Sequence, residues 1–396
     1  MADDSTRSEV IIIGASASGL MCAIEAGKRG RSVVVLDHAN KAGKKILMSG
    51  GGRCNFTNLD VSAENFISHN PHFCKSALSR YSQWDFIAMV HDHQIPYEER
   101  DLGKLFCVNR AKDILNMLLS ECEKAKVTIR LKTEITAIEK ADNKFLIHTS
   151  QGIFQADSLV VASGGLSIPK MCASPLGYKI AEQFGHHIWP TSAGLVPFTL
   201  HPHDKEKLAA LSGIAVASLV STKRKQFKEN ILFTHRGLSG PAILQISSYW
   251  QPGEAININL LPDLDIIDFF KARQSVQPNS QLKTVLGEFL PKQLLITLLG
   301  KDTADTPLQK LSHHRFNEIA RQLQHWKIKP NATEGYRTAE VTLGGIDCDE
   351  LSSRTMESSK VDRLYFIGEV VDVSGWLGGY NFQWAWSSGW CAGQVV

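Results

Sequence analysis

Short apolar runs and helical stretches alternate at the start of the chain. Residues 10–13 are a run of β-branched apolar side chains, the pattern of a strand buried on both faces of a parallel sheet. A glycine-containing turn, an apolar helix through Arg29 and a second apolar run at residues 32–36 follow. This order predicts a βαβ unit of about 30 residues in a doubly wound α/β sheet.

Further along, helical and strand patterns take turns. Residues 62–125 have a mostly helical pattern, and residues 127–131 would extend the parallel sheet. Residues 134–154 alternate apolar and polar side chains around turn signals, which predicts an antiparallel meander. Residues 158–162 form another apolar run that returns to the sheet and ends at a pair of glycines.

The pattern changes again near residue 190. Short alternating strands separated by glycine and proline predict a β-rich insert formed by residues 190–262 and about 329–345. Residues 263–328 have a helical pattern and would form a small helical subdomain. We therefore expect residues 1–189 and 346–396 to build one nucleotide-binding domain around the insert.

Composition narrows the class of protein. The 396 residues carry a formal net charge of +3, which argues against a dedicated nucleic-acid or membrane-surface protein. There is no signal-peptide pattern, and no apolar run approaches the ~20 residues that cross a bilayer, so we expect a cytoplasmic protein without membrane contact. Eight scattered cysteines without a CxxC pair predict neither a metal site nor a disulfide framework.

The first turn carries a dinucleotide-binding fingerprint. GxGxxG is represented by Gly14, Ser16 and Gly19, with a serine in place of the second glycine. Asp37 ends the second strand roughly 20 residues later, where an acidic side chain hydrogen-bonds a ribose. Since strand, helix, second strand and terminal acid are in register, we interpret the unit as dinucleotide-binding. The alternative is a plain doubly wound domain with a tight turn.

A glycine-rich loop, MSGGGRCNFTN at residues 48–58, follows the second strand. In two-dinucleotide-binding flavoproteins a loop at this place folds over the pyrophosphate and reaches the flavin ring. Consecutive glycines would let backbone N–H groups lie against a flat heterocycle where side chains would clash. Lys44, Lys45 and Arg53 would then lie near the anionic part of the cofactor, or else be cations of a solvated loop.

Residues 233–247, FTHRGLSGPAILQIS, combine a strand, a glycine turn and a proline at a plausible first helical turn. Free N–H groups at such a helix start, beside His235 and Arg236, would form a substrate or cofactor anion site. The alternative is a well-capped turn that links the insert to the rest of the chain.

The end of the chain returns to the nucleotide-domain pattern. Residues 364–367 predict another buried strand, which ends at Gly368 and Glu369. A glycine-rich turn at residues 375–379 precedes a helix from about Asn381. In flavoproteins such a carboxylate lies on the ribityl chain, and the positive end of such a helix, with about 0.5 charge, stabilises the anionic reduced flavin. The tryptophans of this helix are expected to pack in the core.

Several long motifs carry a resemblance to a known family: SGGGRCNFTN, FTHRGLSGPAILQIS, VTLGGI and TMESSKVDRLYFIGEVVDVSGWLGGYNFQWAWSSG. In order and spacing the chain resembles the YhiN-type (BaiN-like) NAD(P)/FAD-dependent oxidoreductases, from residue 9 to residue 393. The resemblance implies a glutathione-reductase-like, two-dinucleotide-binding FAD Rossmann domain with an inserted β-rich domain and a small helical subdomain. Ser16 and Asp37 differ from the family's usual residues, but neither change conflicts with FAD binding.

The fingerprint, the glycine loop and the resemblance together give a set of residues expected to bind FAD. They are Gly14, Ser16, Ala17, Ser18, Gly19, Asp37, His38, Lys44, Lys45, Ser49, Gly50, Gly51, Gly52, Arg53, Cys54, Asn55, Ile135, Ala162, Ser163, Gly164, Gly165, Gly368, Glu369, Gly378, Gly379, Tyr380 and Asn381. Cys54, beside the flavin, is a candidate redox or acid residue, or else a small buried loop residue. His235 and Tyr380 are further candidate proton donors.

These observations predict a flavin-dependent oxidoreductase in which NAD(P)H reduces FAD and flavin N5 passes hydride to a small enone-like or quinone-like acceptor. No second GxGxxG unit is present, so a nicotinamide would use the same cleft as the acceptor. One alternative is an RNA-modifying flavoenzyme with a basic helix as its RNA footprint. The residues of that footprint would be His313, His314, Arg315, Arg321 and Lys327. Another alternative is a flavin-binding sensor or interaction module without turnover.

Overall fold

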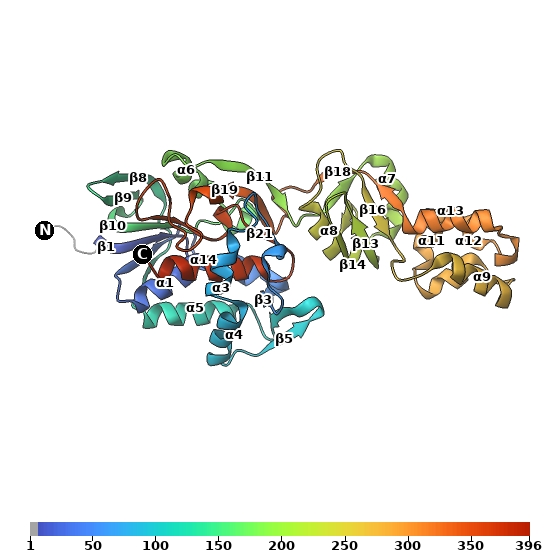
Figure 1. The fold of residues 1–396 in the computed structure, drawn as a ribbon, viewed down its shortest axis with the longest axis horizontal. Coiled ribbons are helices and arrows are strands. Elements are labelled where there is room, and N and C mark those ends of the chain that lie inside the picture. The colour runs from blue at the N-terminus through green and yellow to red at the C-terminus, as the bar shows by residue number, and fades with distance from the viewer. Residues whose placement is uncertain (1–6) are drawn as a thin grey trace. The chain divides into compact units, whose positions relative to one another are not determined.

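Residues 7–396 are described by a computed structural model, in which the chain divides into two units (Figure 1). The first unit comprises the chain up to Ser192 together with Val341–Val396, and the second is Ala193–Glu340. The chain leaves the first unit once and returns to it once, so the residues before the second unit and the residues after it build the first unit together. Within residues 7–396, no helix is long and apolar enough to cross a membrane.

A mostly parallel sheet forms the centre of the first unit. Its strands are β1 (Arg7–Ile13), β2 (Val33–Leu36), β7 (Thr128–Arg130), β8 (Ile135–Ala141), β9 (Lys144–Thr149), β10 (Gly152–Val161) and β20 (Leu364–Phe366). They follow the order β7-β2-β1-β10-β9-β8, with β20 paired to β10. The pairs of β1 with β2 and β10, of β2 with β7 and of β10 with β20 are parallel, whereas β8, β9 and β10 form the predicted antiparallel meander.

Two helices from opposite parts of the sequence lie side by side on this unit. Helix α1 (Ala17–Lys28) contacts helix α14 (Tyr380–Gly393), as Figure 1 shows. Gly389 permits this approach, because a Cβ there would lie 2.5 Å from a carbonyl oxygen of α1. Arg29, at the end of α1, donates from Nη1 to the carbonyl of Val396 at 3.0 Å. The C-terminal helix is therefore an integral part of the first unit.

The segment between β2 and α5 (Lys112–Lys124) forms short helices and strands around the glycine loop. The helices are α2 (Lys44–Met48), α3 (Cys74–Arg80) and α4 (Gln83–Asp92), and the strands are β3 (Asn55–Asn58), β4 (Phe66–Ile67), β5 (Tyr97–Arg100) and β6 (Lys104–Cys107). Strands β3, β6 and β5 form a small antiparallel sheet. The mostly helical prediction for residues 62–125 is wrong for β4, β5 and β6, since strands of two to four residues are too short to give a clear alternation in the sequence.

Four further elements complete the part of the first unit that matters for the site. Helix α6 (Leu176–Gln183) follows β10, strand β11 (Ile188–Gly194) pairs with β19 (Val341–Ile346), and β21 (Ser374–Gly375) pairs with β4. In this way β19 and β21, which come late in the sequence, lie against strands that come early.

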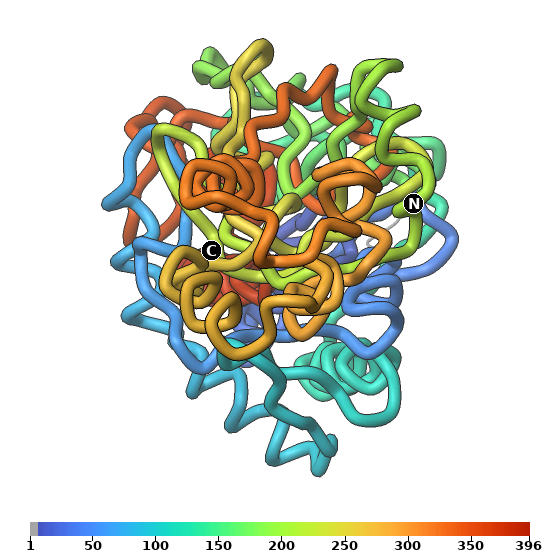
Figure 2. The backbone as a smooth tube through the Cα atoms, turned by 90° about the vertical axis from the view of Figure 1, so that its right-hand side faces the viewer, coloured from blue at the N-terminus to red at the C-terminus, as the bar shows by residue number. Residues whose placement is uncertain are grey.

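The second unit combines an antiparallel sheet with a group of helices. The strand order is β17-β16-β13-β14-β15-β12-β18. The strands are β12 (Phe198–Leu200), β13 (Ala215–Ser221), β14 (Gln226–Phe233), β15 (Gly237–Ser239), β16 (Ile256–Asn259), β17 (Trp326–Ile328) and β18 (Pro330–Thr333). The helices are α7 (Pro202–Leu208), α8 (Pro241–Ser247), α9 (Ile266–Val276), α10 (Leu282–Val285), α11 (Lys292–Leu299), α12 (Lys301–Asp305) and α13 (His313–Gln324). Helices α9 to α13, drawn in yellow and orange, face the viewer in Figure 2.

Candidate functional site

The turn between β1 and α1 of the first unit brings backbone segments into close contact. Gly14 leaves β1 with a φ of +115°, and a Cβ on it would collide with the carbonyl of Ala162. A Cβ on Gly19 would likewise collide with the carbonyl of Gly14. Ser16 is the N-cap residue of α1, but its side chain makes no capping hydrogen bond. The start of α1 therefore suits a pyrophosphate, which backbone N–H groups and the helix dipole bind.

Asp37 braces this turn from the end of β2. Its Oδ2 accepts a hydrogen bond from the N–H of Ala15 at 2.7 Å, and its Oδ1 accepts one from the N–H of Ala39 at 2.7 Å. The imidazole of His38 lies beside it, with Nδ1 at 3.8 Å from Oδ1. Each carboxylate oxygen keeps a lone pair beyond its backbone partner, so Asp37 is chemically able to accept from a ribose hydroxyl as well.

The three glycines of the loop have left-handed backbone, and they differ in their surroundings. Gly50, Gly51 and Gly52 have φ of 56°, 66° and 88°. A Cβ on Gly50 would lie 2.8 Å from the N of Asn55 and 2.9 Å from the ring of Phe106, so this glycine is required by packing. A Cβ on Gly51 or Gly52 would meet nothing within 4 Å. The backbone of these two glycines is open on one side, where a flat ligand can lie against it.

A carboxylate network lies where β10 and β20 end. Glu369 Oε2 is 2.7 Å from Nζ of Lys45, and its Oε1 accepts from Oγ of Ser167 at 2.9 Å and from the N–H of Thr342 at 3.0 Å. A Cβ on Gly165 would lie 2.7 Å from Oε1 of Glu369, so the turn after β10 must be glycine for the carboxylate to stay there. Burial raises the pKa of Glu369, but Lys45 and these hydrogen bonds outweigh it and keep the pKa below the ordinary value.

The other predicted cations have different partners. Lys44 donates from Nζ to Sγ of Cys172 at 3.0 Å, and Arg53 is exposed, with Nη1 at 3.5 Å from Oε1 of Glu98. Of the three cations of the loop, Lys45 is the one that lies with Glu369.

The start of α14 is tied to the residues that follow the glycine loop. Gly379 is the N-cap residue with a φ of +93°, and a Cβ on it would collide with the backbone of Thr57. With its amide oriented so that both ends are satisfied, Asn55 accepts from the N–H of Gly379 at 3.1 Å. Asn381 accepts from the N–H of Gly375 and donates to its carbonyl, each at 2.8 Å. Residues that precede the second unit in the sequence and residues that follow it thus meet at the start of α14.

The candidate proton donors are in different environments. Cys54 is fully buried, and burial raises the pKa of its thiol to about 12, so the thiol is protonated at neutral pH and the packing interpretation is favoured. Tyr380 is 8% exposed, with its ring edge-on to Phe66 at 6.2 Å. His235 is exposed and belongs to the second unit. The proline at position 241 begins helix α8, as predicted, and the anion site expected beside His235 and Arg236 stays a prediction.

Two of the three tryptophans of α14 are buried in the core, as predicted, and Trp390 is half-buried and packs against it. Trp384 and Trp386 are 1% and 0% exposed. The ring of Trp386 is stacked on Phe86 at 4.3 Å, and Nε1 of Trp384 donates to the carbonyl of Gly368 at 3.0 Å. These rings fix α14 against the turn that carries Glu369.

We call the start of α1, Asp37, the glycine loop, the hydrogen-bond network of Glu369 and the start of α14 the cradle. Some residues of this cradle were not singled out from the sequence. Ser167 and Thr342 hold Glu369, and the N–H of Thr133 donates to the carbonyl of Asp37 at 2.9 Å. Ile135 follows two residues later, as the first residue of β8. Thr342 lies in the VTLGGI motif, which carried the family resemblance but did not indicate that Thr342 holds Glu369.

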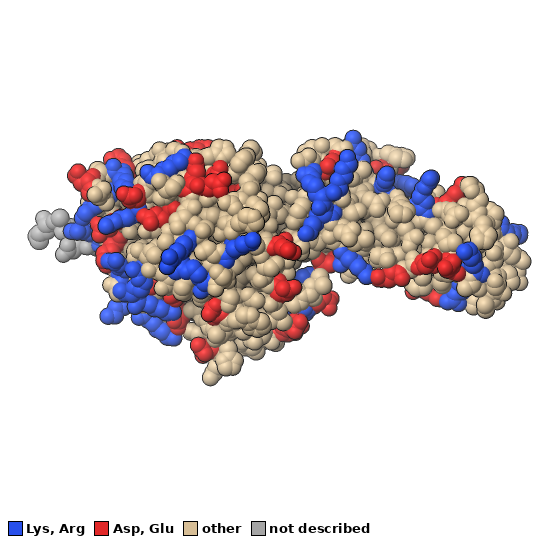
Figure 3. Space-filling model, in the orientation of Figure 1, with Lys and Arg blue, Asp and Glu red and all other residues tan. Residues whose placement is uncertain are grey.

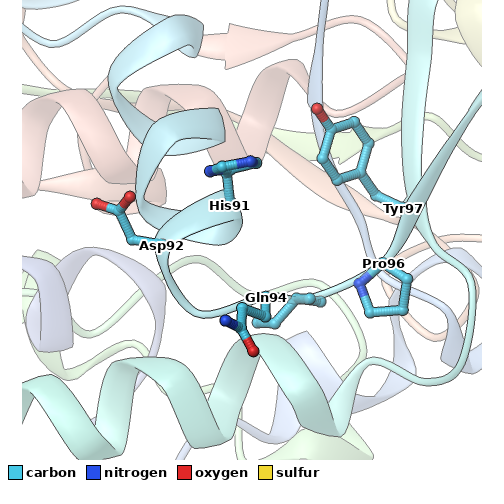
Figure 4. A pocket seen from close by; sticks show the side chains of 6 residues that line it. His91, Asp92, Gln94, Pro96 and Tyr97 are labelled. Carbon is cyan, nitrogen blue, oxygen red and sulfur yellow. The ribbon is translucent and has the colours of Figure 1, made fainter.

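A separate surface hollow lies away from these residues, where α4 ends and β5 begins. It has a volume of about 560 Å³ and its lining residues are His91, Asp92, Gln94, Ile95, Pro96 and Tyr97 (Figure 4). None of them is among the residues expected to bind FAD, so this hollow is not part of the candidate site.

Comparison with known proteins identifies the family. The HI0933-like protein Rossmann domain matches residues 8–395. The chain belongs to the HI0933-like family. It is 54% identical over 391 residues to the ribosomal RNA dihydrouridine synthase of Escherichia coli (strain K12), with 98% of each chain covered. It is 28% identical over 403 residues to the 3-dehydro-bile acid delta(4,6)-reductase of Clostridium scindens, with 97% of this chain and 98% of that one covered.

Solved structures share the fold. The 3-ketosteroid-delta4-(5alpha)-dehydrogenase from Rhodococcus jostii RHA1 has a TM-score of 0.51 at 13% identity, covering 99% of this chain and 98% of that one. The Mycobacterium smegmatis Sdh1 complex in the apo form has a TM-score of 0.51 at 15% identity, covering 98% of this chain and 67% of that one. The predicted fold class, a Rossmann-type FAD-binding α/β domain, and the predicted YhiN-type (BaiN-like) family relationship are confirmed. The chain is a member of a flavin-dependent oxidoreductase family.

Proposed function

We propose that this chain is an FAD-dependent enzyme that reduces a uridine of ribosomal RNA to dihydrouridine, with NAD(P)H as the electron donor. The observation that carries the proposal is the 54% identity over 98% of both chains to the Escherichia coli enzyme of that name. The Haemophilus influenzae relative with the same name is 49% identical over 98% of both chains. The proposal therefore follows the RNA-modifying alternative raised from the sequence rather than the reduction of a free small-molecule acceptor.

Uracil in RNA and an enone, one of the small-molecule acceptors expected from the sequence, are reduced by the same chemistry. The C5=C6 bond of uracil is conjugated to a carbonyl group, as is the double bond of an enone. Reduction adds hydride to the β carbon and a proton to the α carbon in both cases. A site built for enone-like acceptors therefore has the chemistry for uracil, and the polymer attached to the base decides how it is bound.

The residues of the cradle fit FAD. The start of α1 and the open backbone of Gly51 and Gly52 would hold the pyrophosphate and the ring, and Glu369, fixed by Lys45, would hold the ribityl chain. FAD, when bound, supplies hydride transfer from a reduced nicotinamide to a polarised double bond. The chain's own groups bind and orient the cofactor, and the start of α14 offers the positive end of a helix dipole.

The second unit offers cations for RNA. Arg321, Lys327 and Lys329 are exposed on α13, β17 and the residue after it. Arg315, which was expected in this footprint, is instead engaged by Oε2 of Glu318 at 2.6 Å and Oγ1 of Thr303 at 2.7 Å. Both signs of charge are interspersed over the face that Figure 3 shows. Such contacts to phosphates make binding strongly salt-dependent.

The test is nucleoside analysis of ribosomal RNA. Recombinant protein is loaded with FAD and incubated with NADH or NADPH and with ribosomal RNA that lacks dihydrouridine, and the digested nucleosides are separated by mass spectrometry. The proposal predicts dihydrouridine that depends on enzyme, FAD and reduced nicotinamide. Oxidation of the nicotinamide without dihydrouridine would contradict it, and absence of any flavin reduction would favour a sensor or interaction module.

A second candidate is reduction of a free enone. It is favoured by the 28% identity over 97% of the chain to the Clostridium scindens bile acid reductase. A steroid enone and 2-cyclohexenone in the same assay test it. Turnover of an enone with no dihydrouridine in RNA would select this candidate.

A further inference from the structure

A histidine that the sequence did not single out is held in a fixed orientation in the first unit, just after β4. Nδ1 of His69 lies 2.8 Å from Oδ2 of Asp372, and the backbone N–H of His69 donates to the same oxygen at 2.8 Å. The imidazole is stacked on the ring of Trp189, with centroids 3.8 Å apart and planes 5° apart. One hydrogen bond and one stacked ring therefore fix the imidazole, and the second hydrogen bond holds the backbone of His69 to the same carboxylate.

The two members of this dyad differ sharply in exposure. The side chain of Asp372 is 4% exposed, whereas that of His69 is 52% exposed. Because Nδ1 faces the carboxylate, Nε2 lies on the opposite edge of the ring. Burial raises the pKa of Asp372, although the hydrogen bonds and the charge of His69 oppose that shift. A buried carboxylate that holds the far nitrogen of an exposed imidazole is the arrangement that orients a histidine and stabilises its cation in acid–base catalysis.

Backbone hydrogen bonds connect the dyad to the cradle. Strand β19 donates to Glu369 through the N–H of Thr342, and four residues later the carbonyl of Ile346 accepts from the N–H of Asp372 at 3.0 Å. At ~3.3 Å per residue the two contact points are at most about 13 Å apart, since Gly344 and Gly345 between them have left-handed backbone. Strand β21, which follows Asp372, pairs with β4, which precedes His69, and leads to the start of α14. Along the chain, Asp372 thus lies between Glu369 and the start of α14, the two groups that are proposed to hold the flavin.

The other candidate donors are less suited to protonate carbon. The thiol of Cys54 is fully buried and has its pKa raised to about 12. Tyr380 is 8% exposed, which leaves little of its side chain open to an acceptor. A donor must be able to reach the acceptor, and an oriented, half-exposed imidazole is accessible to it.

We propose that His69, oriented by Asp372, is the proton donor to the double bond that this enzyme reduces. The inference rests on the proposed function. In the step, hydride adds to C6 of uracil and the proton leaves Nε2 of the His69 cation for C5. The two electrons come with the hydride, which NAD(P)H supplies by way of FAD. The product is 5,6-dihydrouracil, and the neutral imidazole regains its proton from water.

A second histidine on the same tryptophan gives a matched control. His187 meets Trp189 edge-on at 4.7 Å, its Nδ1 lies 3.2 Å from Oδ2 of Asp347, and its side chain is 50% exposed. Two further titratable groups near the dyad are Asp349, which accepts from Asn70, and Cys348, whose Sγ lies 3.6 Å from Oγ of Ser68 and donates to the carbonyl of Asp372 at 3.5 Å. His187→Gln therefore removes an imidazole of similar exposure and similar pairing without touching the dyad.

The experiment separates proton transfer to carbon from flavin reduction. Wild type, His69→Gln, Asp372→Asn and His187→Gln are reduced anaerobically by reduced nicotinamide and then mixed with ribosomal RNA lacking dihydrouridine, with 2-cyclohexenone, or with ferricyanide, which needs no proton on carbon. FAD affinity is measured for each. For His69→Gln we expect FAD affinity, flavin reduction and reoxidation by ferricyanide within about twofold of wild type. Reoxidation by the carbon acceptors should be slower by about 100-fold or more, with a flattened pH profile, and His187→Gln should match wild type.

The outcomes distinguish this inference from the proposed function. Equal rates with carbon acceptors for His69→Gln and wild type, or equal losses for His69→Gln and His187→Gln, would overturn the role of His69. A loss of ferricyanide reoxidation in parallel with the carbon acceptors would also overturn it, because the defect would then be structural. If wild type reduces the enone but not RNA, the proposed function fails and the enone arm still decides on His69. If wild type reduces neither, both proposals fail.

Discussion

Replacing Lys45 and Glu369, singly and together, tests how much their ion pair stabilises the cradle. Nζ and Oε2 are 2.7 Å apart, and the side chains are 26% and 20% exposed. Exposed pairs contribute about 0–1 kcal/mol, and breaking a fully buried pair costs about 3–5 kcal/mol. This partly buried pair lies between, so Lys45→Met or Glu369→Gln should each cost about 2 kcal/mol. Since 1 kcal/mol moves Tm by about 2–4 °C in a domain of about 150–250 residues, each variant should lower Tm by about 4–8 °C.

The assay is thermal unfolding of FAD-free protein at pH 7, followed by FAD titration. Because the partners share one interaction, the double variant should lose little more than either single variant, with a coupling of about 1–2 kcal/mol. Lys271→Met is the matched control, since its pair with Asp268 is at 3.0 Å but has side chains 49% and 73% exposed, and it should change stability by less than about 0.5 kcal/mol. Additive losses without coupling would refute the reasoning.

The same pair predicts a pH dependence. The pKa of Glu369 lies below 4.5 in the fold, because Lys45 and the hydrogen bonds outweigh the effect of burial. A carboxyl whose pKa is lowered on folding stabilises the fold fully above its unfolded pKa, and the stabilisation is lost as pH falls through the folded pKa. The difference in Tm between wild type and Glu369→Gln should therefore shrink below pH 4.5, and a difference that grows there would contradict the assignment.

Gly51→Ala and Gly30→Ala place a Cβ at open, left-handed positions with φ of 66° and 82°. Both should cost about 1–2 kcal/mol in unfolding experiments, but only Gly51→Ala should weaken FAD binding. Equal FAD affinities for the two variants would contradict the role of the loop. His186 is buried, and burial lowers its pKa below 6.5, so the fold should lose stability as pH falls below 6.5, and this loss should be smaller in His186→Gln when Tm is compared at pH 7.5 and pH 5.5. Arg321→Gln and Lys327→Gln should weaken RNA binding independently of sequence and reduce the salt slope by about 0.7–0.9 per lost phosphate contact, whereas an unchanged slope would remove α13 and β17 from the interface.

Local pattern carried most of what the sequence predicted about the nucleotide-binding unit. The unbroken apolar runs of β1 and β2 form buried strands, because strands covered on both faces have no polar positions to alternate with. Gly14 and Gly19 are required by contacts within the turn itself, so a short motif was enough to indicate them. The same holds for the glycine loop, whose left-handed backbone is a local property.

What the sequence did not indicate depends on contacts between distant segments. Asp372 and His69 are 303 residues apart in the chain, and no periodicity links them. Ser167 and Thr342 are ordinary polar residues until β10, β19 and β20 place them around Glu369. The burial of Cys54 likewise follows from packing beneath the loop, and it weakens the case for a reactive thiol that its place in the motif had suggested.

The most direct test of the central claim is the stoichiometry and affinity of FAD on purified protein. Segments from both parts of the sequence are proposed to enclose one flavin and its pyrophosphate, so FAD-free protein should take up one FAD per chain with quenching of flavin fluorescence. Glu369→Gln and Gly51→Ala should each weaken that binding, and Gly30→Ala should leave it unchanged. Protein that stays colourless after reconstitution, or variants that all bind FAD as wild type does, would contradict the account.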